Sequence, residues 1–325
     1  MRRRLSGLAT AVLTLVALAG CGSSDTDGGG AASASGGGTT RVTVGVIPIV
    51  DVAPLYLGQK KGFFSSRGLD LKMVTAQGGA AIIPGVVSGQ FQFGFSNTTS
   101  LMIAQTKGVP VKSVVNGAAS NGKVGADVTG VAVKQDSPVK SAKDLAGRTV
   151  AVNTLQNIGD TTVRESVRQD GGDPAQVKFV EIPFDQMPAA LDGGRVDAAW
   201  MGEPAMTVAK GQGARVVASP FAETDTKLTV ATYFTATKLL SENPTLVRKF
   251  TEAMTESLKY ASEHPDEARQ ILTTYTKISG DVLKNLTLPS WPPGVDMASL
   301  EKLASLGEKD GIFGDKKPDL EALFS

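Results

Sequence analysis

Short runs of β-branched and aliphatic residues alternate along the chain with segments whose apolar residues recur at helical spacing. Pro48 closes the first such run, and Gly89 and Gly108 stop two of the helical segments. The predicted strands cover residues 41–47, 69–75 and 91–95, and the predicted helices cover residues 54–64, 80–87 and 98–106. Strands separated by helices of this length predict right-handed βαβ units and a mainly parallel sheet.

The same order of elements recurs about 105 residues further along the chain. Residues 43–46 (TVGV) match 149–152 (TVAV), residues 71–74 match 177–180, and residues 88–95 match 193–200. Three matches in one order indicate two lobes of like topology, although any two βαβ units share some chance similarity. We therefore predict an α/β fold of two lobes, each a mainly parallel sheet flanked by helices.

Beyond Phe221 the pattern turns helical and does not return to βαβ units. Ser241 with Pro244 marks the start of one helix, and Pro265 marks the start of another. The apolar face of the first consists of Val247, Phe250, Met254, Leu258 and Ala261, and that of the second consists of Ala268, Ile271, Leu272 and Tyr275. Because these faces have no strand-rich partner of their own, we expect the tail to pack on the first lobe.

This packing requires the chain to cross between the lobes twice, near residues 131–134 and near residues 231–235. The predicted first lobe therefore consists of residues 41–132 and 235–325, and the second of residues 133–234. Two lobes joined by two hinge crossovers can close on a small molecule between them.

The beginning of the chain predicts an export signal. Three arginines precede an apolar run over residues 8–19, which is too short to span a bilayer as a helix. The sequence Leu18-Ala19-Gly20-Cys21 resembles a bacterial lipobox, and this resemblance implies cleavage before Cys21 and acylation of its thiol. Cys21 is the only Cys in the chain, and the alternative is a free buried Cys in an uncleaved helix.

The predicted signal peptide is therefore residues 1–20, and residues 21–40 form a lipid-anchored tether. The tether contains no large apolar side chain, so it cannot fold alone. We expect an extracytoplasmic protein, held on the periplasmic side at the outer face of the cell membrane by its lipid anchor only.

Composition changes this picture mainly by what it excludes. The 325 residues are 41% hydrophobic and 20% charged, which is ordinary for a globular chain with two cores. If the three arginines at the start of the chain are removed with the signal peptide, 30 of the 33 basic residues remain. Against 32 acidic residues they give a net charge near −2. No basic stripe occurs outside the leader, so nucleic acid is excluded as a partner.

Ligands of open α/β sheets bind beyond the carboxyl ends of the strands, where helix N-termini present free N–H groups. The repeat therefore predicts a site between six loops, three from each lobe. These loops are residues 48–51, 77–80 and 96–98 in the first lobe and residues 153–160, 183–185 and 201–203 in the second. The candidate ligand-binding residues in them are Pro48, Asp51, Gln77, Gly78, Gly79, Ser96, Asn97, Thr98, Asn153, Asn157, Asp160, Phe184, Met201 and Glu203.

The polar candidates also have purely structural interpretations. Asp51, Thr98 and Asp160 occupy positions where helix N-caps belong, and the two glycines can simply turn the chain. Asn97 is the strongest single candidate, because its amide both donates and accepts between a strand end and a helix start.

The remaining candidates lie in the second lobe or are aromatic. Glu203 stands at a helix start and can compensate the helix dipole instead of binding a ligand. Phe184 and Met201 can form a wall of the site or belong to the core. Trp200 and Trp291 are aromatic candidates for the wall, with core packing favoured for Trp291.

Four stretches of the chain together resemble the nitrate/sulfonate/taurine-type solute-binding proteins of ABC importers. They are VGVIPIVDVAPLYLGQKKGFFSSRGLDL, VVSGQFQFGFSNTTSLMIAQTKGVPVK, SAKDLAGRTVAVN and AALDGGRVDAAWMGEPA, within residues 41–275. The resemblance implies a two-lobed periplasmic-binding-protein fold, hinge closure on a small-molecule solute, and delivery to an ABC permease with cytoplasmic ATPases. It places the cleft at the six loops given above, and we expect a monomer.

The charges in these loops bear on the solute. None of the six loops contains Lys or Arg, whereas Asp51, Asp160, Asp185 and Glu203 lie in them. Backbone N–H groups can hold an oxyanion without Arg. Charge complementarity nevertheless favours a neutral or zwitterionic organic solute over an inorganic anion such as nitrate.

Two other classes of function compete with solute import. An enzyme resembling the pyrimidine synthases of thiamine biosynthesis would need histidines and a cysteine cluster, yet His264, which we expect to be exposed at a helix end, and Cys21 are the only ones. We therefore expect no catalytic residue, no metal site and no cofactor, although a carboxylate-only mechanism stays open. A non-transport receptor for a membrane sensor needs the same closing cleft, and the sequence does not separate it from an importer.

Overall fold

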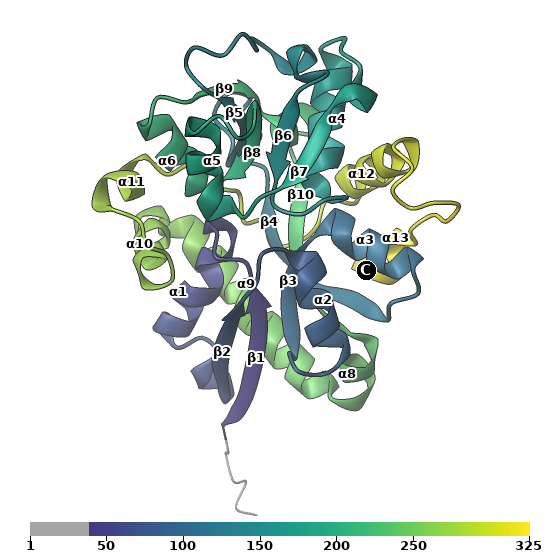
Figure 1. Cartoon of the computed structure of the whole chain (residues 1–325). Helices are drawn as coiled ribbons and strands as arrows, with labels where there is room; N and C mark the ends of the chain where they lie inside the picture. Colours follow the sequence, from purple (N-terminus) through teal and green to yellow (C-terminus); the bar gives the residue numbers. More distant parts are fainter. Residues whose placement is uncertain (1–38) are drawn as a thin grey trace, which may run out of the picture. The chain divides into compact units, whose positions relative to one another are not determined.

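Two five-stranded sheets, each flanked by helices, make up the computed structural model, which describes residues 39–325 (Figure 1). The predictions for the signal peptide, for Cys21 and for the tether fall on residues 1–38 and lie outside the described residues, apart from the last two residues of the tether.

The first sheet has the strand order β2-β1-β3-β10-β4. Strand β1 is parallel to both its neighbours, β2 and β3, while β10 is antiparallel to both β3 and β4. The strands are β1 (Thr40–Val46), β2 (Leu69–Thr75), β3 (Phe93–Asn97), β4 (Val111–Ala119) and β10 (Thr229–Ala236), and the helices that connect the first four are α1 (Ala53–Lys61), α2 (Gly79–Val87) and α3 (Thr98–Thr106).

The second sheet has the equivalent order β7-β6-β8-β5-β9. Its strands are β5 (Thr129–Val133), β6 (Thr149–Val152), β7 (Lys178–Glu181), β8 (Ala198–Gly202) and β9 (Arg215–Ala218), and its helices are α4 (Ile158–Gln169), α5 (Met187–Asp192), α6 (Ala205–Gly211) and α7 (Pro220–Thr224). Strands β6, β7 and β8 repeat the parallel arrangement of β1, β2 and β3. The predicted two-lobed α/β architecture is therefore confirmed.

The chain passes between the sheets a few residues earlier than the sequence pattern predicts. Strand β5 lies wholly in the second sheet and β10 wholly in the first, so the crossovers are residues 120–128 and 219–228. Val128 and Leu228, directly before these strands, are as buried as the strand residues that follow. Because burial continues from these residues into the strands, the sequence pattern does not show where the chain passes from one sheet to the other.

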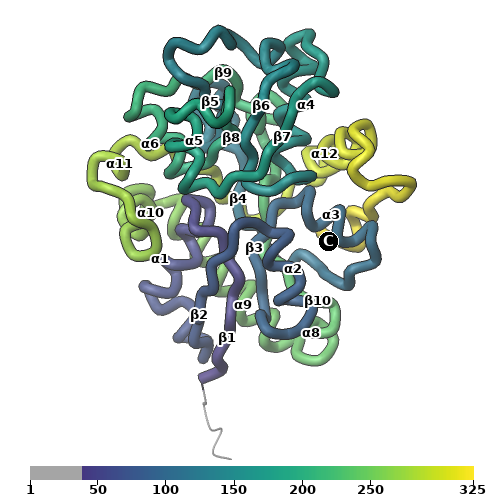
Figure 2. The backbone as a smooth tube through the Cα atoms, viewed as in Figure 1, coloured from purple at the N-terminus to yellow at the C-terminus, as the bar shows by residue number. Residues whose placement is uncertain are grey.

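The C-terminal segment is helical, and its long helix α9 (Pro244–Glu263) packs on the first lobe, as its apolar face predicted. The other helices of this segment are α8 (Thr237–Glu242), α10 (Pro265–Gln270), α11 (Gly280–Asn285), α12 (Met297–Lys309) and α13 (Leu320–Phe324). Helix α9 packs on α1 and β4, and the C-terminal segment, yellow in Figure 2, lies beside α3. The predicted start at Ser241 falls in the separate short helix α8, because Asn243 caps α9 by accepting from Leu246 N at 3.0 Å.

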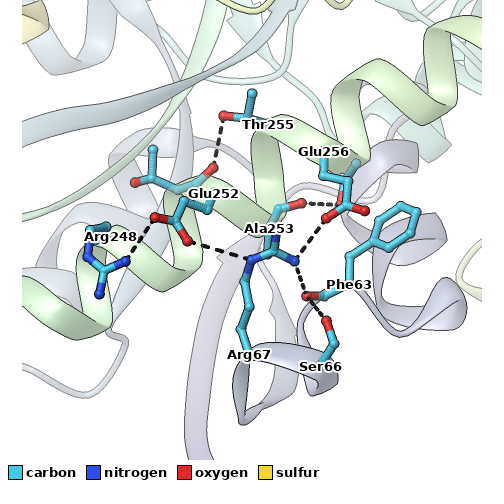
Figure 3. A network of polar contacts seen from close by, with 10 residues as sticks. Phe63, Ser66, Arg67, Arg248, Glu252, Ala253, Thr255 and Glu256 are labelled. Atoms are coloured by element: carbon cyan, nitrogen blue, oxygen red, sulfur yellow. Dashed lines mark hydrogen bonds and ion pairs between the residues drawn. The ribbon is translucent and has the colours of Figure 1, made fainter.

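Both apolar packing and an outer polar network hold α9 in place. Phe250 stacks on Phe93 with ring centroids 3.8 Å apart. At the surface, Arg67 pairs with Glu256 at 2.9 Å and donates to Phe63 O at 2.8 Å (Figure 3). Because exposed ion pairs contribute little, the buried ring contributes most of the stabilisation.

We predict that Phe250→Ala lowers the free energy of unfolding by about 3–5 kcal/mol, because it opens a cavity between α9 and the first sheet. Denaturant unfolding measures this loss. The exposed Lys259→Ala on the same helix is the control and should change stability by less than about 0.5 kcal/mol. Equal stabilities of the two variants would show that α9 is an appendage.

Candidate ligand-binding site

The strand-end loops of the two sheets contact each other directly. Gln77 Nε2 donates to Asn153 O at 3.3 Å, and Asn153 Nδ2 donates back to Gln77 O at 3.1 Å. Val50 N donates to Glu203 O at 3.2 Å. The loops that follow β1 and β2 therefore face the loops that follow β6 and β8, as the repeat predicted.

Two glycines allow close approaches at this contact. A Cβ on Gly78 would lie 2.7 Å from Thr154 Cγ2 of the second sheet, so the glycine lets the two loops meet. A Cβ on Gly79 would lie 1.9 Å from Ser96 Oγ, which leaves no room for a side chain at the start of α2. Gly78 therefore serves the contact between the sheets, and Gly79 serves packing within the first.

In the loop after β6, the predicted polar residues mainly bind one another. Asn157 caps α4 by accepting from Gly159 N at 2.8 Å, and its amide nitrogen donates to Asn153 Oδ1 at 2.9 Å. Asp160 accepts from Gln156 N at 2.8 Å and from Asn157 N at 3.2 Å, which completes a capping box. Burial raises the pKa of Asp160, and these two N–H groups oppose the rise. The loop is held rigidly by its own side chains.

At the end of β3 the helix cap is one residue earlier than the sequence suggested. Asn97, not Thr98, caps α3, since its Oδ1 accepts from Ser100 N at 2.8 Å. Thr98 instead donates to Thr229 O of β10 at 3.2 Å, and Ser96 donates to Asn97 O at 3.0 Å. The amide nitrogen of Asn97 makes no hydrogen bond to any residue in 39–325, so it remains a free donor.

Glu203 is fully buried and already has protein donors. Its Oε2 accepts from Thr207 N at 3.0 Å, and its Oε1 accepts from Thr207 Oγ1 at 2.8 Å and from Thr287 N at 3.4 Å. Burial raises the pKa of the carboxyl, and the bonds from Thr207 and Thr287 oppose this. Thr287 lies in the C-terminal segment, and nothing local in the sequence indicated that it would reach the second sheet.

Trp200, Phe184 and Met201 differ in their burial and in the side chains around them. Trp200 on β8 is 3% exposed, lies 5.6 Å from both Phe184 and Phe221 by ring centroids, and its Nε1 has no partner in the described part of the chain. Phe184 is partly exposed, whereas Met201 is buried in a cluster on the other side of the sheet. Met201 therefore belongs to the core.

Asp51 is the candidate with the most unusual surroundings. It is 6% exposed, and its backbone carbonyl accepts from the buried Trp291 Nε1 at 3.2 Å. Pro48, at the start of the same loop, is exposed. Burial raises the pKa of Asp51 to about 7, its own backbone N–H opposes the rise, and the charge of Asp127 adds to it.

The remaining features within residues 39–325 are His264, potential metal ligands, helix lengths and a surface cavity. His264 lies at the end of α9, partly buried and stacked on Tyr260 at 3.9 Å, not fully exposed as expected. No group of three or more His, Cys, Asp or Glu side chains in this part of the chain could hold a metal ion. None of its helices is both long and apolar enough to span a bilayer. A cavity of about 840 Å³ lies over the outer face of α9, beside Glu252 and Glu256.

The chain is similar in sequence to known binding proteins. The chain is 23% identical over 285 residues to the "Putative aliphatic sulfonates-binding protein" of Bacillus subtilis, covering 86% of this chain and 81% of that protein. It is 25% identical over 237 residues to the riboflavin-binding protein RibY of Chloroflexus aurantiacus, covering 70% of this chain and 63% of RibY.

A solved structure shows the same fold. The alkanesulfonate-binding protein SsuA from Xanthomonas axonopodis, bound to MOPS, has a TM-score of 0.75 at 14% identity, covering 88% of this chain and 99% of SsuA. These relatives are named as binding proteins. The family described as NMT1/THI5 like matches residues 49–268, more than half of the sequence, and the chain therefore belongs to that family of periplasmic-binding-protein fold.

Proposed function

We propose that the chain is the extracytoplasmic solute-binding lipoprotein of an ABC importer. It captures a small organic solute between the two sets of strand-end loops and delivers it to the permease. The observation that carries this proposal is the direct contact of the loops, through the reciprocal bonds of Gln77 with Asn153 and the bond from Val50 to Glu203. The names of the relatives, which are binding proteins and not enzymes, support it.

The capture step uses the two crossovers as a hinge. Each sheet keeps its own fold, and the chain passes between them only at residues 120–128 and 219–228. Loops that touch through three hydrogen bonds can separate at modest cost, because each bond exchanged with water contributes about 1 kcal/mol. The described arrangement is then the closed form, and opening admits the solute.

The solute is organic, and neutral or zwitterionic. The six loops contain no Lys or Arg, and the buried Asp51, Asp160 and Glu203 lie in them. A bare inorganic anion would face these carboxylates without a Lys or Arg in the loops themselves. A thermal-shift screen of aliphatic sulfonates, amino acids, riboflavin, pyrimidines and nitrate tests the proposal, and a chain that responds to none of them would contradict it.

The first prediction concerns hinge closure. In a Cys21→Ser background, Gly78→Cys with Thr154→Cys should form a disulfide on oxidation, because these positions are in contact across the sheets. The oxidised variant should lose solute exchange and show a smaller radius of gyration in X-ray scattering, and reduction should restore both. Either single variant is the control. A cross-linked protein that still exchanges solute freely would show that the loops do not gate the site.

The second prediction separates the two roles of Asn97. Asn97→Asp keeps the cap acceptor for Ser100 N and removes the free amide donor, so affinity for the screened solute should fall while the melting temperature holds. Asn97→Ala should lose the same affinity and also about 1 kcal/mol of stability. Unchanged affinity in Asn97→Asp would leave Asn97 as a helix cap only.

The third prediction concerns the anchor at Cys21, which lies outside the described residues. Cys21→Ser should release the protein from the membrane fraction in soluble, folded form, because one acylated cysteine supplies the whole anchor. Cell fractionation followed by a salt wash measures this. Retention of the variant in the washed membrane would show that the anchor is elsewhere.

A further inference from the structure

The loop after β1 contains a buried carboxylate without a cationic partner. Among the described residues, no other group donates a hydrogen bond to the Asp51 carboxyl, and no Lys or Arg charge acts on its pKa, which only its own backbone N–H lowers. Asp127 does not compensate the charge of Asp51, because it is itself an acid. Its carboxylate already accepts from Ser120 Oγ, Asn121 N and Val128 N. A buried charge of this kind is unfavourable unless something pairs with it.

A second unsatisfied group comes from a different part of the chain. Tyr233 on β10 is 0% exposed, and its hydroxyl has no hydrogen-bond partner among residues 39–325. Its ring is held against Phe95, with centroids 5.2 Å apart. Tyr233 pairs with Val115 of β4, and the short 3-10 turn that holds Asp51 (Val50–Val52) packs on β4, so the two groups come from neighbouring parts of the fold. Burial raises the pKa of the Tyr233 hydroxyl, and the charges of Tyr56 and Asp51 raise it further. Buried hydroxyls of Tyr normally find a partner.

Aromatic rings border this pair of groups. Tyr56 stacks on Tyr275 with centroids 4.0 Å apart, and Tyr275 Oη donates to Ile49 O at 3.0 Å. Both rings are partly exposed, while Trp291 is buried and holds the Asp51 carbonyl. The Tyr275 hydroxyl is thus engaged, whereas the Tyr233 hydroxyl is free. Ring faces beside a carboxylate attract a cationic or polarised N–H group.

We infer that Asp51 and Tyr233 form one end of the solute site and select a solute that presents a nitrogen-bound hydrogen there, as an amine or an N–H of a heterocycle. This inference rests on the proposed function and names the chemical class of its solute. An N–H group donates to the Asp51 carboxylate and satisfies the buried charge. A sulfonate or nitrate oxygen at the same place would be repelled by it.

Tyr233 becomes a specificity-determining residue in this arrangement. The sequence offered no sign of it, because it lies within β10, far along the chain from the six loops. Its hydroxyl can donate to a solute acceptor next to the N–H group or accept from the N–H group itself. The pair therefore recognises a donor beside an acceptor, a pattern found in amides and amino-heterocycles.

The test uses matched probes that differ in one N–H group. Taurine is compared with ethanesulfonate, and riboflavin with 3-methylriboflavin, by calorimetry on the purified full chain. The N–H member of at least one pair should bind at least tenfold more tightly than its match. Asp51→Asn should remove most of that preference, and Tyr233→Phe should weaken binding of the preferred member severalfold without lowering the melting temperature.

Tyr260→Phe is the matched control for loss of a hydroxyl. Its hydroxyl donates to Glu267 at 2.9 Å on the outside of α9, so this variant should bind the probes like the parent chain. Equal affinity within each pair, or a preference that survives Asp51→Asn, overturns the inference and leaves the proposed function standing. If none of the four probes and none of the solutes in the wider screen binds, both the inference and the proposed function are contradicted.

The protein without solute supplies an independent readout. The pKa of Asp51, about 7, is above its ordinary value, so its contribution to stability is complete at low pH and is lost as pH rises through 7. The facing groups are Asp127, Tyr56, Tyr233 and Tyr275. Asp51→Asn should therefore melt several degrees higher than the parent at pH 8.5 and no higher at pH 4. If the difference in melting temperature between the parent chain and Asp51→Asn were the same at pH 8.5 and at pH 4, the Asp51 carboxylate would already have a partner.

Discussion

The structure depends on one constraint of parallel sheets. A strand that is parallel to both its neighbours must send every connection back across the sheet, so the loops at the carboxyl ends gather along one edge. In this chain β1 and β6 are each parallel to both neighbours. Two equivalent sheets thus present two equivalent edges, and the crossovers bring these edges face to face. The position of the proposed solute site therefore follows from the topology of the sheets and not from particular side chains.

Sequence patterns predicted this arrangement well where local pattern and tertiary burial agree. Residues 69–75 match β2 residue for residue, because alternating burial leaves a clear strand signal. Caps were harder, since Asn97 and Thr98 are both good N-cap residues, and only backbone geometry decides between them. The contacts of Tyr233 and Thr287 join positions more than eighty residues apart in the chain, and no periodic pattern carries such information.

The buried carboxylates at the loops differ in what surrounds them. Glu203 and Asp160 are each matched by N–H or O–H donors, so both are part of the framework that shapes a helix start. Asp51 has almost the same burial but only its own N–H. In the sequence alone, the three carboxylates are equivalent acidic residues of the loops. Their roles separate only when each oxygen is assigned its donors.

The C-terminal segment also links the two sheets, independently of the crossovers. Thr287 N bonds Glu203 at 3.4 Å, and Asp310 at the end of α12 pairs with Arg168 of α4 at 2.6 Å. Any movement of the second sheet away from the first strains or breaks these contacts, so in the proposed hinge closure they favour the closed form. Apparent affinity scales with the competent fraction. Natural variation in this segment can therefore tune how tightly the protein holds its solute without altering any residue that touches it.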